Sequence, residues 1–483
     1  MWVGTGATGV VQLDQVVVMR STRLTLLALA SALALAGCGA GGEVADPGVG
    51  APQGADAFLV AQCPDAGIRP NGDKEFTYWS MWNADEPQGR VLSKAIRCFT
   101  DKTGVKVNVL WLGRDLLTRN VAPALNTGTV PDLFDQDVSQ VMASVVSAGG
   151  TQPVEDVLDY RVGEGDLKVR DVLPVASYDF PQNKGPDGKI FEIPYVVFGS
   201  AWWYDRTVAG RVVAPKTTDE LFQLFDNAKS TGIAALAQDG DRSTSNAALF
   251  TQAAVRYLGA GGLTRAAQDK TGDVWRNDVG LYQAAEFVEK IATGRYLIPG
   301  WDSAKYPTLQ HRWATGEAAY LSLPGWVPSE TKEYLAKKGD DRTVSLASFP
   351  FPQPPAATHT VAERVPVGFA VAAKAKNPGA AKAFIAYVLN KDILSGVPAV
   401  ADNLTPRADL PVPESQKDIR AGLTDPAVEQ ALYLDGVNAV AGGRWVETVL
   451  YPLTDSLLRG NISAADFIDA VADKQVKFWR TAK

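Results

Sequence analysis

The sequence is poor in the residues on which many enzymes and metal sites depend. Its 483 residues include only two histidines and three cysteines. Neither His311 nor His359 has a second histidine, a cysteine pair or a glutamate at ligand spacing, and both are interpreted as incidental. This scarcity argues against histidine-based zinc sites and Ser-His-Asp hydrolases. We therefore expect no catalytic residues, no metal and no cofactor.

The sequence also lacks the clustered positive charge of a nucleic-acid-binding protein. Its 47 basic and 54 acidic side chains give a net charge of −7, and no run of five like charges occurs. Binding to phosphates without sequence preference needs a basic stripe that displaces counterions. We expect no nucleic-acid partner.

Long apolar runs are scarce, and the prominent one lies near the N-terminus. Arg20 and Arg23 precede an apolar or small stretch over residues 24–36. A membrane-spanning helix needs roughly 20 residues for a hydrocarbon core of ~30 Å, so this run is too short. The charge followed by the apolar run predicts a secretory signal peptide within a leader of residues 1–37. Residues 1–18 precede the charged start and are predicted not to be translated.

The end of the leader, residues 35–38, resembles the lipobox of bacterial lipoproteins. In that motif the cysteine is acylated and becomes the new N-terminus, so Cys38 is the expected lipid anchor. The protein would then face the extracytoplasmic side of the cell membrane. An ordinary signal peptide with an incidental cysteine is the alternative. Residues 38–57 are rich in Gly, Ala and Pro and are expected to form a flexible tether.

The two remaining cysteines form an even pair in an oxidising compartment. Cys63 and Cys98 are therefore predicted to form a disulfide. Two buried thiols are the alternative.

Strand and helix signals alternate through the mature chain. Residues 75–79 read as a strand, the apolar face over 91–99 as a helix that ends at Gly104, and 105–111 as a second strand. The order repeats through 116–124 and 131–134, which predicts an α/β fold that starts with a parallel sheet. Further helices are predicted behind Thr217, over 281–292, behind Asn377, over 445–458 and over 463–478.

A series of short motifs follows in order from Phe76 to the C-terminus. They are Trp79 and Trp82, then residues 99–107, 128–134, 193–195, 203–205, 316–320, 325–326, 366–368 and 377–381, and finally Trp445. Each is weak alone. Their order over about 400 residues resembles the extracellular solute-binding proteins of bacterial ABC importers, in the maltose-binding-like, carbohydrate-oriented group. The long Pro-rich stretch 350–363 departs from that pattern.

The resemblance implies a two-lobed α/β fold of the periplasmic-binding-protein type, with a hinge that the chain crosses three times. The crossings are expected near residues 195–197, 365–367 and 412. The lobes would comprise residues 58–196 plus 367–412, and 197–366 plus 413–483. The implied partners of this monomer are a carbohydrate, either mono- or oligosaccharide, and the membrane subunits of an importer, which read the closure of the hinge.

Sugars present apolar C–H faces and a rim of hydroxyls, so their sites combine flat aromatic rings with planar polar side chains. The chain has twelve tryptophans from which to build such a site. Trp326 follows Gly325, Trp445 follows Gly442 and Gly443, and both match cleft positions of the resembled family. We interpret both tryptophans as ligand platforms, with core packing as the alternative.

Polar candidates come from strand ends, where open α/β sheets bind ligands. Trp82 and Asn83 end the first strand, and structure is as plausible as function there. Asp135 and Asp137 follow a later strand, and helix capping is an equal alternative for Asp137. The full predicted set is Trp82, Asn83, Asp135, Asp137, Phe198, Gly325, Trp326 and Trp445.

Two other functions stay open from the sequence. An extracytoplasmic saccharide-acting enzyme would need two carboxylates about 5 to 10 Å apart around the bond. Glu330 and Glu333 lie on one helix face, but this pattern is typical of solvated surface. The same fold with a non-sugar cargo, such as a polyamine or a peptide, is the other alternative.

Overall fold

The computed structural model describes residues 54–482 except 69 and 71. The leader, Cys38 and most of the expected tether lie outside these residues. Helix α1 (Ala55–Val60) already covers the end of that tether, so the prediction of a flexible segment up to residue 57 is wrong for its last residues. The chain from Ala51 onward forms one compact unit.

A mixed sheet of nine strands runs through the described part of the chain in the order β2-β1-β3-β8-β4-β6-β5, with β7 on β4 and β9 on β8. The strands are β1 (Glu75–Ser80), β2 (Lys106–Trp111), β3 (Leu133–Asp137), β4 (Glu192–Asp205), β5 (Ala234–Ala237), β6 (Ala318–Pro324), β7 (Leu346–Phe349), β8 (Val361–Val371) and β9 (Glu429–Leu432). The expected parallel pairing holds for β1 with β2 and β3. The next pairings are antiparallel, because β8 is antiparallel to both β3 and β4. Parallel pairing occurs again for β5 with β6 and for β8 with β9.

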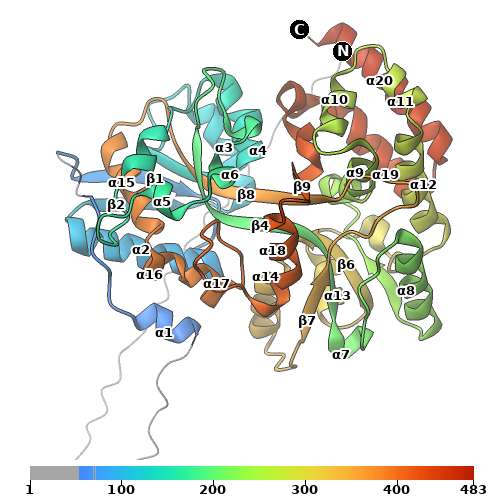
Figure 1. The fold of residues 1–483 in the computed structure, drawn as a ribbon, viewed down its shortest axis with the longest axis horizontal. Helices are drawn as coiled ribbons and strands as arrows, with labels where there is room; N and C mark the ends of the chain where they lie inside the picture. Colours follow the sequence, from blue (N-terminus) through green and yellow to red (C-terminus); the bar gives the residue numbers. More distant parts are fainter. Residues whose placement is uncertain (1–53, 69, 71, 483) are drawn as a thin grey trace, which may run out of the picture. The chain divides into compact units, whose positions relative to one another are not determined.

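Strands β4 and β8 lie side by side and run from one lobe into the other (Figure 1). Residues 192–199 of β4 pair with β8, whereas residues 200–205 pair with β6 and β7. The chain passes between the lobes a third time over residues 402–416, because α17 (Gly396–Ala401) packs on α2 and α18 (Lys417–Thr424) packs on β7. The expected two-lobed fold with three crossings is confirmed.

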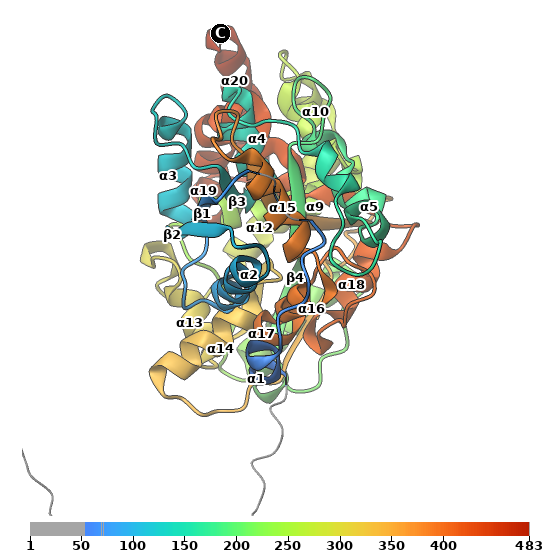
Figure 2. The same cartoon turned by 90° about the vertical axis from the view of Figure 1, so that its left-hand side faces the viewer.

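Each lobe has its own hydrophobic core. The first is built around Phe76, Phe99 and Phe384, and the second around Phe225 and Trp275. Helices of the first lobe are α2 (Pro87–Thr103), α3 (Arg114–Ala124), α4 (Val138–Ser144), α5 (Val169–Val172), α6 (Val175–Tyr178), α15 (Pro378–Val388) and α16 (Lys391–Leu394). Figure 2 views this lobe from outside, with α2 and α15 packed against the sheet.

The helices of the second lobe surround the other half of the sheet. They are α7 (Arg206–Ala209), α8 (Thr218–Ser230), α9 (Ser243–Leu258), α10 (Gly262–Gln268), α11 (Asp273–Asn277), α12 (Val279–Thr293), α13 (Thr308–Ala314), α14 (Val327–Lys338), α19 (Tyr451–Leu458) and α20 (Ala464–Thr481). The helix predicted behind Thr217 is confirmed as α8, and the Thr217 side chain caps it by accepting a hydrogen bond from the Glu220 N–H.

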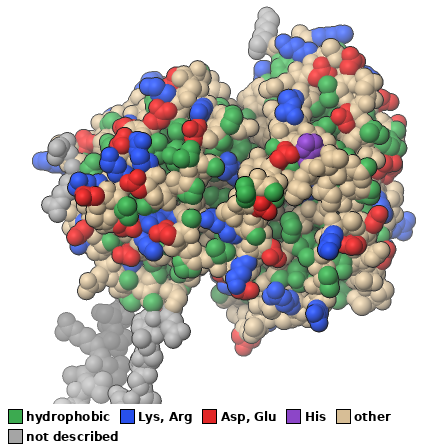
Figure 3. All heavy atoms as spheres, in the orientation of Figure 1, with side chains coloured by type: hydrophobic (Ala, Val, Ile, Leu, Met, Phe, Trp, Pro, Cys, Tyr) green, Lys and Arg blue, Asp and Glu red, His purple; other side chains and the backbone are tan. Residues whose placement is uncertain are grey.

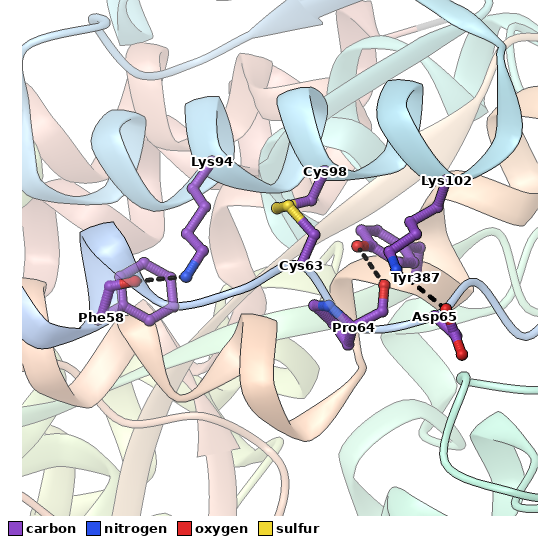
Figure 4. The surroundings of a disulfide bond; sticks show 8 residues. All are labelled: Phe58, Cys63, Pro64, Asp65, Lys94, Cys98, Lys102 and Tyr387. Atoms are coloured by element: carbon purple, nitrogen blue, oxygen red, sulfur yellow. Dashed lines mark hydrogen bonds and ion pairs between the residues drawn. A yellow bond between two sulfur atoms is a disulfide. The ribbon is translucent and has the colours of Figure 1, made fainter.

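The predicted disulfide between Cys63 and Cys98 is confirmed (Figure 4). It fastens the N-terminal segment to α2. On either side of the bond, the Lys94 ammonium donates to the carbonyl of Phe58, and the Tyr387 hydroxyl donates to the carbonyl of Pro64 at 3.1 Å. The segment that leads into the first lobe is therefore held by both α2 and α15.

Within the described residues, no single helix is both long and apolar enough to cross a membrane. Helix α15 and the following residues 391–401 meet those criteria only as a pair bent by 69°.

Candidate functional site

A cavity of about 240 Å³ lies between the two lobes. Its lining residues come from both sides of the hinge. They are Met81, Arg114, Asp115, Thr118, Gln136, Asp137, Ser139, Gln140, Phe198, Arg242, Thr244, Ser245, Tyr306, Leu323, Trp326, Glu330, Val365, Pro366, Val367, Tyr433 and Asn438. The space-filling view shows the surface notched between the lobes (Figure 3).

A larger cavity of about 490 Å³ adjoins this one and shares Gln140 and Asn438 with it. It lies between α4 and the C-terminal part of the chain. The smaller cavity contains three of the predicted site residues, and the larger one contains none of them. We therefore take the smaller cavity as the candidate site.

The first lobe lines the cavity with residues at its strand ends. Met81 directly follows β1, Arg114 follows β2 after a short turn, and Asp137 closes β3. Because β1, β2 and β3 are parallel neighbours, their carboxyl ends meet at one edge of the sheet. This edge faces the second lobe across the cavity.

Arg114 connects the two walls. Its guanidinium lies 4.5 Å from the Trp82 ring centroid, 3.4 Å from a Glu86 carboxylate oxygen and 3.7 Å from a carboxylate oxygen of Glu330 on α14. The Tyr306 hydroxyl also donates to Glu330, at 2.8 Å. Burial raises the pKa of Glu330, and the neighbouring Arg114 opposes that shift. An ion pair and a hydrogen bond therefore meet at one carboxylate between the lobes.

Three predicted residues line the cavity: Asp137, Phe198 and Trp326. The Trp326 ring packs edge-on against Phe198 with centroids 5.5 Å apart, and its indole N–H has no partner among the described residues. Asp137 caps α4 by accepting from the Gln140 N–H at 3.1 Å, and burial raises its pKa to about 6. Asp137 therefore both caps α4 and lines the cavity, two roles that were alternatives from the sequence.

Trp82 and Asp135 lie behind the cavity wall and do not line it. Both side chains are fully buried. The Trp82 indole N–H donates to the Tyr195 hydroxyl at 2.6 Å, and that hydroxyl donates to Asp135 at 2.6 Å. Burial raises the pKa of Asp135 to about 6. The chain of bonds ties the end of β1 to β3 and β4, so these residues support the wall from behind.

The structure places the remaining three predicted residues away from the cavity. Asn83 is exposed and bonds to Glu86. The Gly325 carbonyl accepts hydrogen bonds from the Asn403 and Gln416 side chains, in the packing behind Trp326.

The interpretation of Trp445 as an open platform is wrong for this structure. Its side chain is fully buried in the second core and stacks on Trp275 with centroids 6.2 Å apart. Core packing, the alternative considered for it, describes its surroundings.

Several cavity residues were missed by the sequence reasoning. They are Arg114, Arg242, Tyr306, Glu330, Tyr433 and Asn438. Arg114 and Arg242 follow the ends of β2 and β5, so the strand-end rule that found Asp137 points to them as well. Tyr306 lies in an irregular segment without a local signal. The prediction that Glu330 belongs to solvated surface is wrong, because it is half-buried against Arg114 and Tyr306.

Comparison with known proteins places these features in a family. The model of the bacterial extracellular solute-binding proteins matches residues 83–393, which is more than half of the chain. An uncharacterised ABC transporter extracellular-binding protein of Pyrococcus horikoshii is 22% identical over 346 residues, covering 70% of this chain and 72% of the relative.

Solved structures share the fold at low identity. The solute receptor AcbH, described as preferring β-D-galactopyranose, has a TM-score of 0.68 at 18% identity, over 85% of this chain and 99% of that one. The GacH receptor of Streptomyces glaucescens, solved unliganded and with acarbose, has a TM-score of 0.63 at 18% identity, over 86% and 100%. From the extent of the family match, this chain belongs to the bacterial extracellular solute-binding proteins of ABC transporters.

Proposed function

We propose that this protein captures a carbohydrate in the cavity between its lobes and delivers it to an ABC importer. The observation that carries the proposal is the Trp326 ring, which stands at the cavity wall with an unpartnered indole N–H. A flat ring with a free donor at its edge suits a sugar, whose C–H face stacks while a hydroxyl oxygen accepts the hydrogen bond.

The other lining residues supply the polar partners that a sugar needs. Gln136, Gln140 and Asn438 carry amides, and Thr244 and Tyr433 carry hydroxyls. The Asn438 side-chain oxygen is buried without a partner among the described residues, so it is available to a ligand hydroxyl. Relatives with this fold that bind galactopyranose or acarbose agree with this class of ligand.

In this proposal the lobes close on the ligand by bending at the three crossings. We assign residues 58–196 plus 367–412 to one lobe and 197–366 plus 413–483 to the other. The two hydrophobic cores support this division, since few of their members cross the boundaries. Closure would present a surface that the importer's membrane subunits distinguish from the open form.

We further propose that a lipid on Cys38 holds this monomer to the outer face of the cell membrane. The lipobox-like sequence at residues 35–38 supports the assignment. Cys38→Ser should move the protein from the membrane fraction to the medium, or leave it as uncleaved precursor. Unchanged membrane fractionation of the variant would contradict the anchor.

The protein is proposed to bind without chemistry, as its family relatives are binding proteins. Two of the cavity's carboxylates are already engaged: Asp137 caps α4, and Glu330 meets Arg114, Tyr306 and Gln310. Incubation with oligosaccharides should yield no new reducing ends. Their appearance would favour the saccharide-acting enzyme instead.

A thermal-shift screen against mono- and oligosaccharides tests the proposal. A ligand that binds only the folded state stabilises it by about 2.7 kcal/mol at a hundredfold excess over Kd. We expect at least one saccharide to raise the melting temperature in a concentration-dependent way. If no saccharide does so while an amine or a peptide does, the carbohydrate assignment is wrong.

A further inference from the structure

The cavity contains two arginines whose surroundings differ. Arg114 has carboxylates on both sides, from Glu86 and Glu330. Arg242 lies over the Tyr306 ring, with its guanidinium carbon 4.3 Å from the ring centroid. It forms no ion pair and no side-chain hydrogen bond with any residue that the structure describes. Its charge is therefore not neutralised by direct contact.

The stacking partner of Arg242 is itself held in place. The Tyr306 N–H donates to Asp241 at 2.8 Å, and the Tyr306 hydroxyl donates to Glu330 at 2.8 Å. The Arg242 N–H donates to the carbonyl of Asp239 at 3.2 Å, just before α9 begins. A guanidinium stacked on a fixed ring keeps the N–H groups at its edge free, and that edge matches the two oxygens of an oxyanion.

None of the carboxylates that line the cavity pairs with the Arg242 guanidinium. Glu330 is paired with Arg114, and Asp137 accepts from the first turn of α4. Asp115 is exposed on α3, in the wall formed by the first lobe. Thr244 and Ser245, which follow Arg242 and also line the cavity, add hydroxyl donors on the same side. This side of the cavity offers donors and positive charge, and the nearby Asp239 carboxylate accepts from the Leu309 N–H rather than from the Arg242 side chain.

We propose that the ligand is an acidic saccharide whose oxyanion pairs with Arg242. A uronic acid carboxylate and a sugar phosphate both present that chemistry. The inference rests on the proposed function, because it names the class of carbohydrate within the same cavity. Arg242 then determines specificity, while Trp326 and the amides hold the neutral part of the sugar.

Calorimetric titration of the wild-type protein with matched ligands tests this. The probes are galacturonic acid and its oligomers, galactose and its oligomers, glucuronic acid, glucose and glucose 6-phosphate. We expect an acidic member to bind at least about tenfold more tightly than its neutral counterpart, which is ~1.4 kcal/mol. Tight binding of glucose 6-phosphate alone would identify phosphate as the oxyanion, and tight binding of the uronates would identify the carboxylate.

The variant Arg242→Gln should lower the ratio of acidic to neutral affinity by at least about tenfold, the same ~1.4 kcal/mol. Arg242→Lys keeps the charge but loses the two-pronged edge, so its ratio should fall between those of the wild type and Arg242→Gln. Arg211→Gln is the matched control, since Arg211 is an exposed arginine outside the cavity and its loss should leave both affinities unchanged. Melting of each variant without ligand checks that the fold is intact.

Two results would overturn the inference in distinguishable ways. If neutral sugars bind as tightly as acidic ones, or if Arg242→Gln weakens both equally, the cavity binds carbohydrate but the acidic class is wrong. If no saccharide of either kind binds, the proposed function falls and the inference falls with it.

Discussion

Trp326 and Trp445 both follow glycine-containing turns, but their surroundings in the second lobe differ. Trp326 is partly exposed at the N-terminal end of α14, where it lines the cavity and packs edge-on against Phe198. Trp445 is completely enclosed and lies against Trp275 in the core. Of these two similar residues, Trp326 thus lines the cavity and Trp445 belongs to the core.

The two indole N–H groups sharpen this difference. Neither has a hydrogen-bond partner among the described residues. A buried donor left unpaired costs about 1–3 kcal/mol. Under the proposed function a ligand oxygen removes that cost at Trp326, which lines the cavity, whereas Trp445 does not line it. The proposal therefore treats the same unpaired group as a binding feature at Trp326 and as a loss of stability at Trp445.

The largest effect is expected from Trp445. Trp445→Ala should lower the free energy of unfolding by about 3 to 5 kcal/mol, because it leaves a cavity in the second core. Trp445→Phe should cost less, since it keeps an aromatic ring against Trp275 and removes the unpaired N–H. Urea unfolding measures both variants. A stable Trp445→Ala protein that has lost its ligand affinity would return Trp445 to the binding site.

The next largest effect on stability is expected from removing the disulfide of the first lobe. Replacing Cys63 and Cys98 together by serine should lower the free energy of unfolding by about 3 to 4 kcal/mol, because the unfolded chain gains entropy when the loop is no longer closed. Ligand affinity of the folded protein should not change, because neither cysteine lines the cavity. In the wild type, both thiols should resist alkylation until a reductant is added; labelling without reductant would contradict the bond.

Two glutamates show the same contrast between the cavity and the protein interior. Glu330 faces the cavity and has three partners, but Glu363 on β8 is enclosed and its two oxygens have none among the described residues. Burial raises the pKa of Glu363 from 4.5 to about 8, and the nearby Arg256 opposes that shift only in part. At pH values between these two pKa values, the Glu363 carboxyl stays protonated in the folded protein, whereas it loses its proton in the unfolded chain.

Stability should therefore fall as pH rises through this window, with Glu363 contributing ~1.4 kcal/mol per pH unit. Glu363→Gln stays neutral and should remove that part of the slope. The free energy of unfolding of both proteins, measured by urea at several pH values from about 5 to 8, tests the assignment. Equal slopes for the two proteins would mean that Glu363 is ionised in the folded state.

Local features of the structure could be predicted from the sequence. The helix that ends at Gly104, the helix behind Thr217 and the pairing of Cys63 with Cys98 depend on nearby residues or on simple counting, and all three are confirmed. The antiparallel insertion of β8 beside β3 depends on residues more than 200 positions apart. No local pattern reports such a pairing, and the prediction of a parallel sheet covered only its start, over β1, β2 and β3.

The residues around the candidate site also separate into those with a local sequence signal and those without one. Asp137 and Trp326 carry signals at a strand end and after a turn, and both line the cavity. The position of Trp445 could not be read locally, because its burial is set by Trp275, which lies on a helix far away in the chain. Tyr306 lies in an irregular segment, and its role emerges only where Glu330 and Arg242 converge on it.

The role of Trp326 in ligand binding is tested by the affinity of Trp326→Ala for a saccharide found in the thermal-shift screen. We expect a loss of at least about tenfold, or ~1.4 kcal/mol, with unliganded melting close to that of the wild type. Trp326→Phe should lose less, since it keeps a ring but not the N–H. If the folded fraction of Trp326→Ala keeps wild-type affinity while its melting temperature drops strongly, Trp326 is a core residue like Trp445 and not a ligand platform.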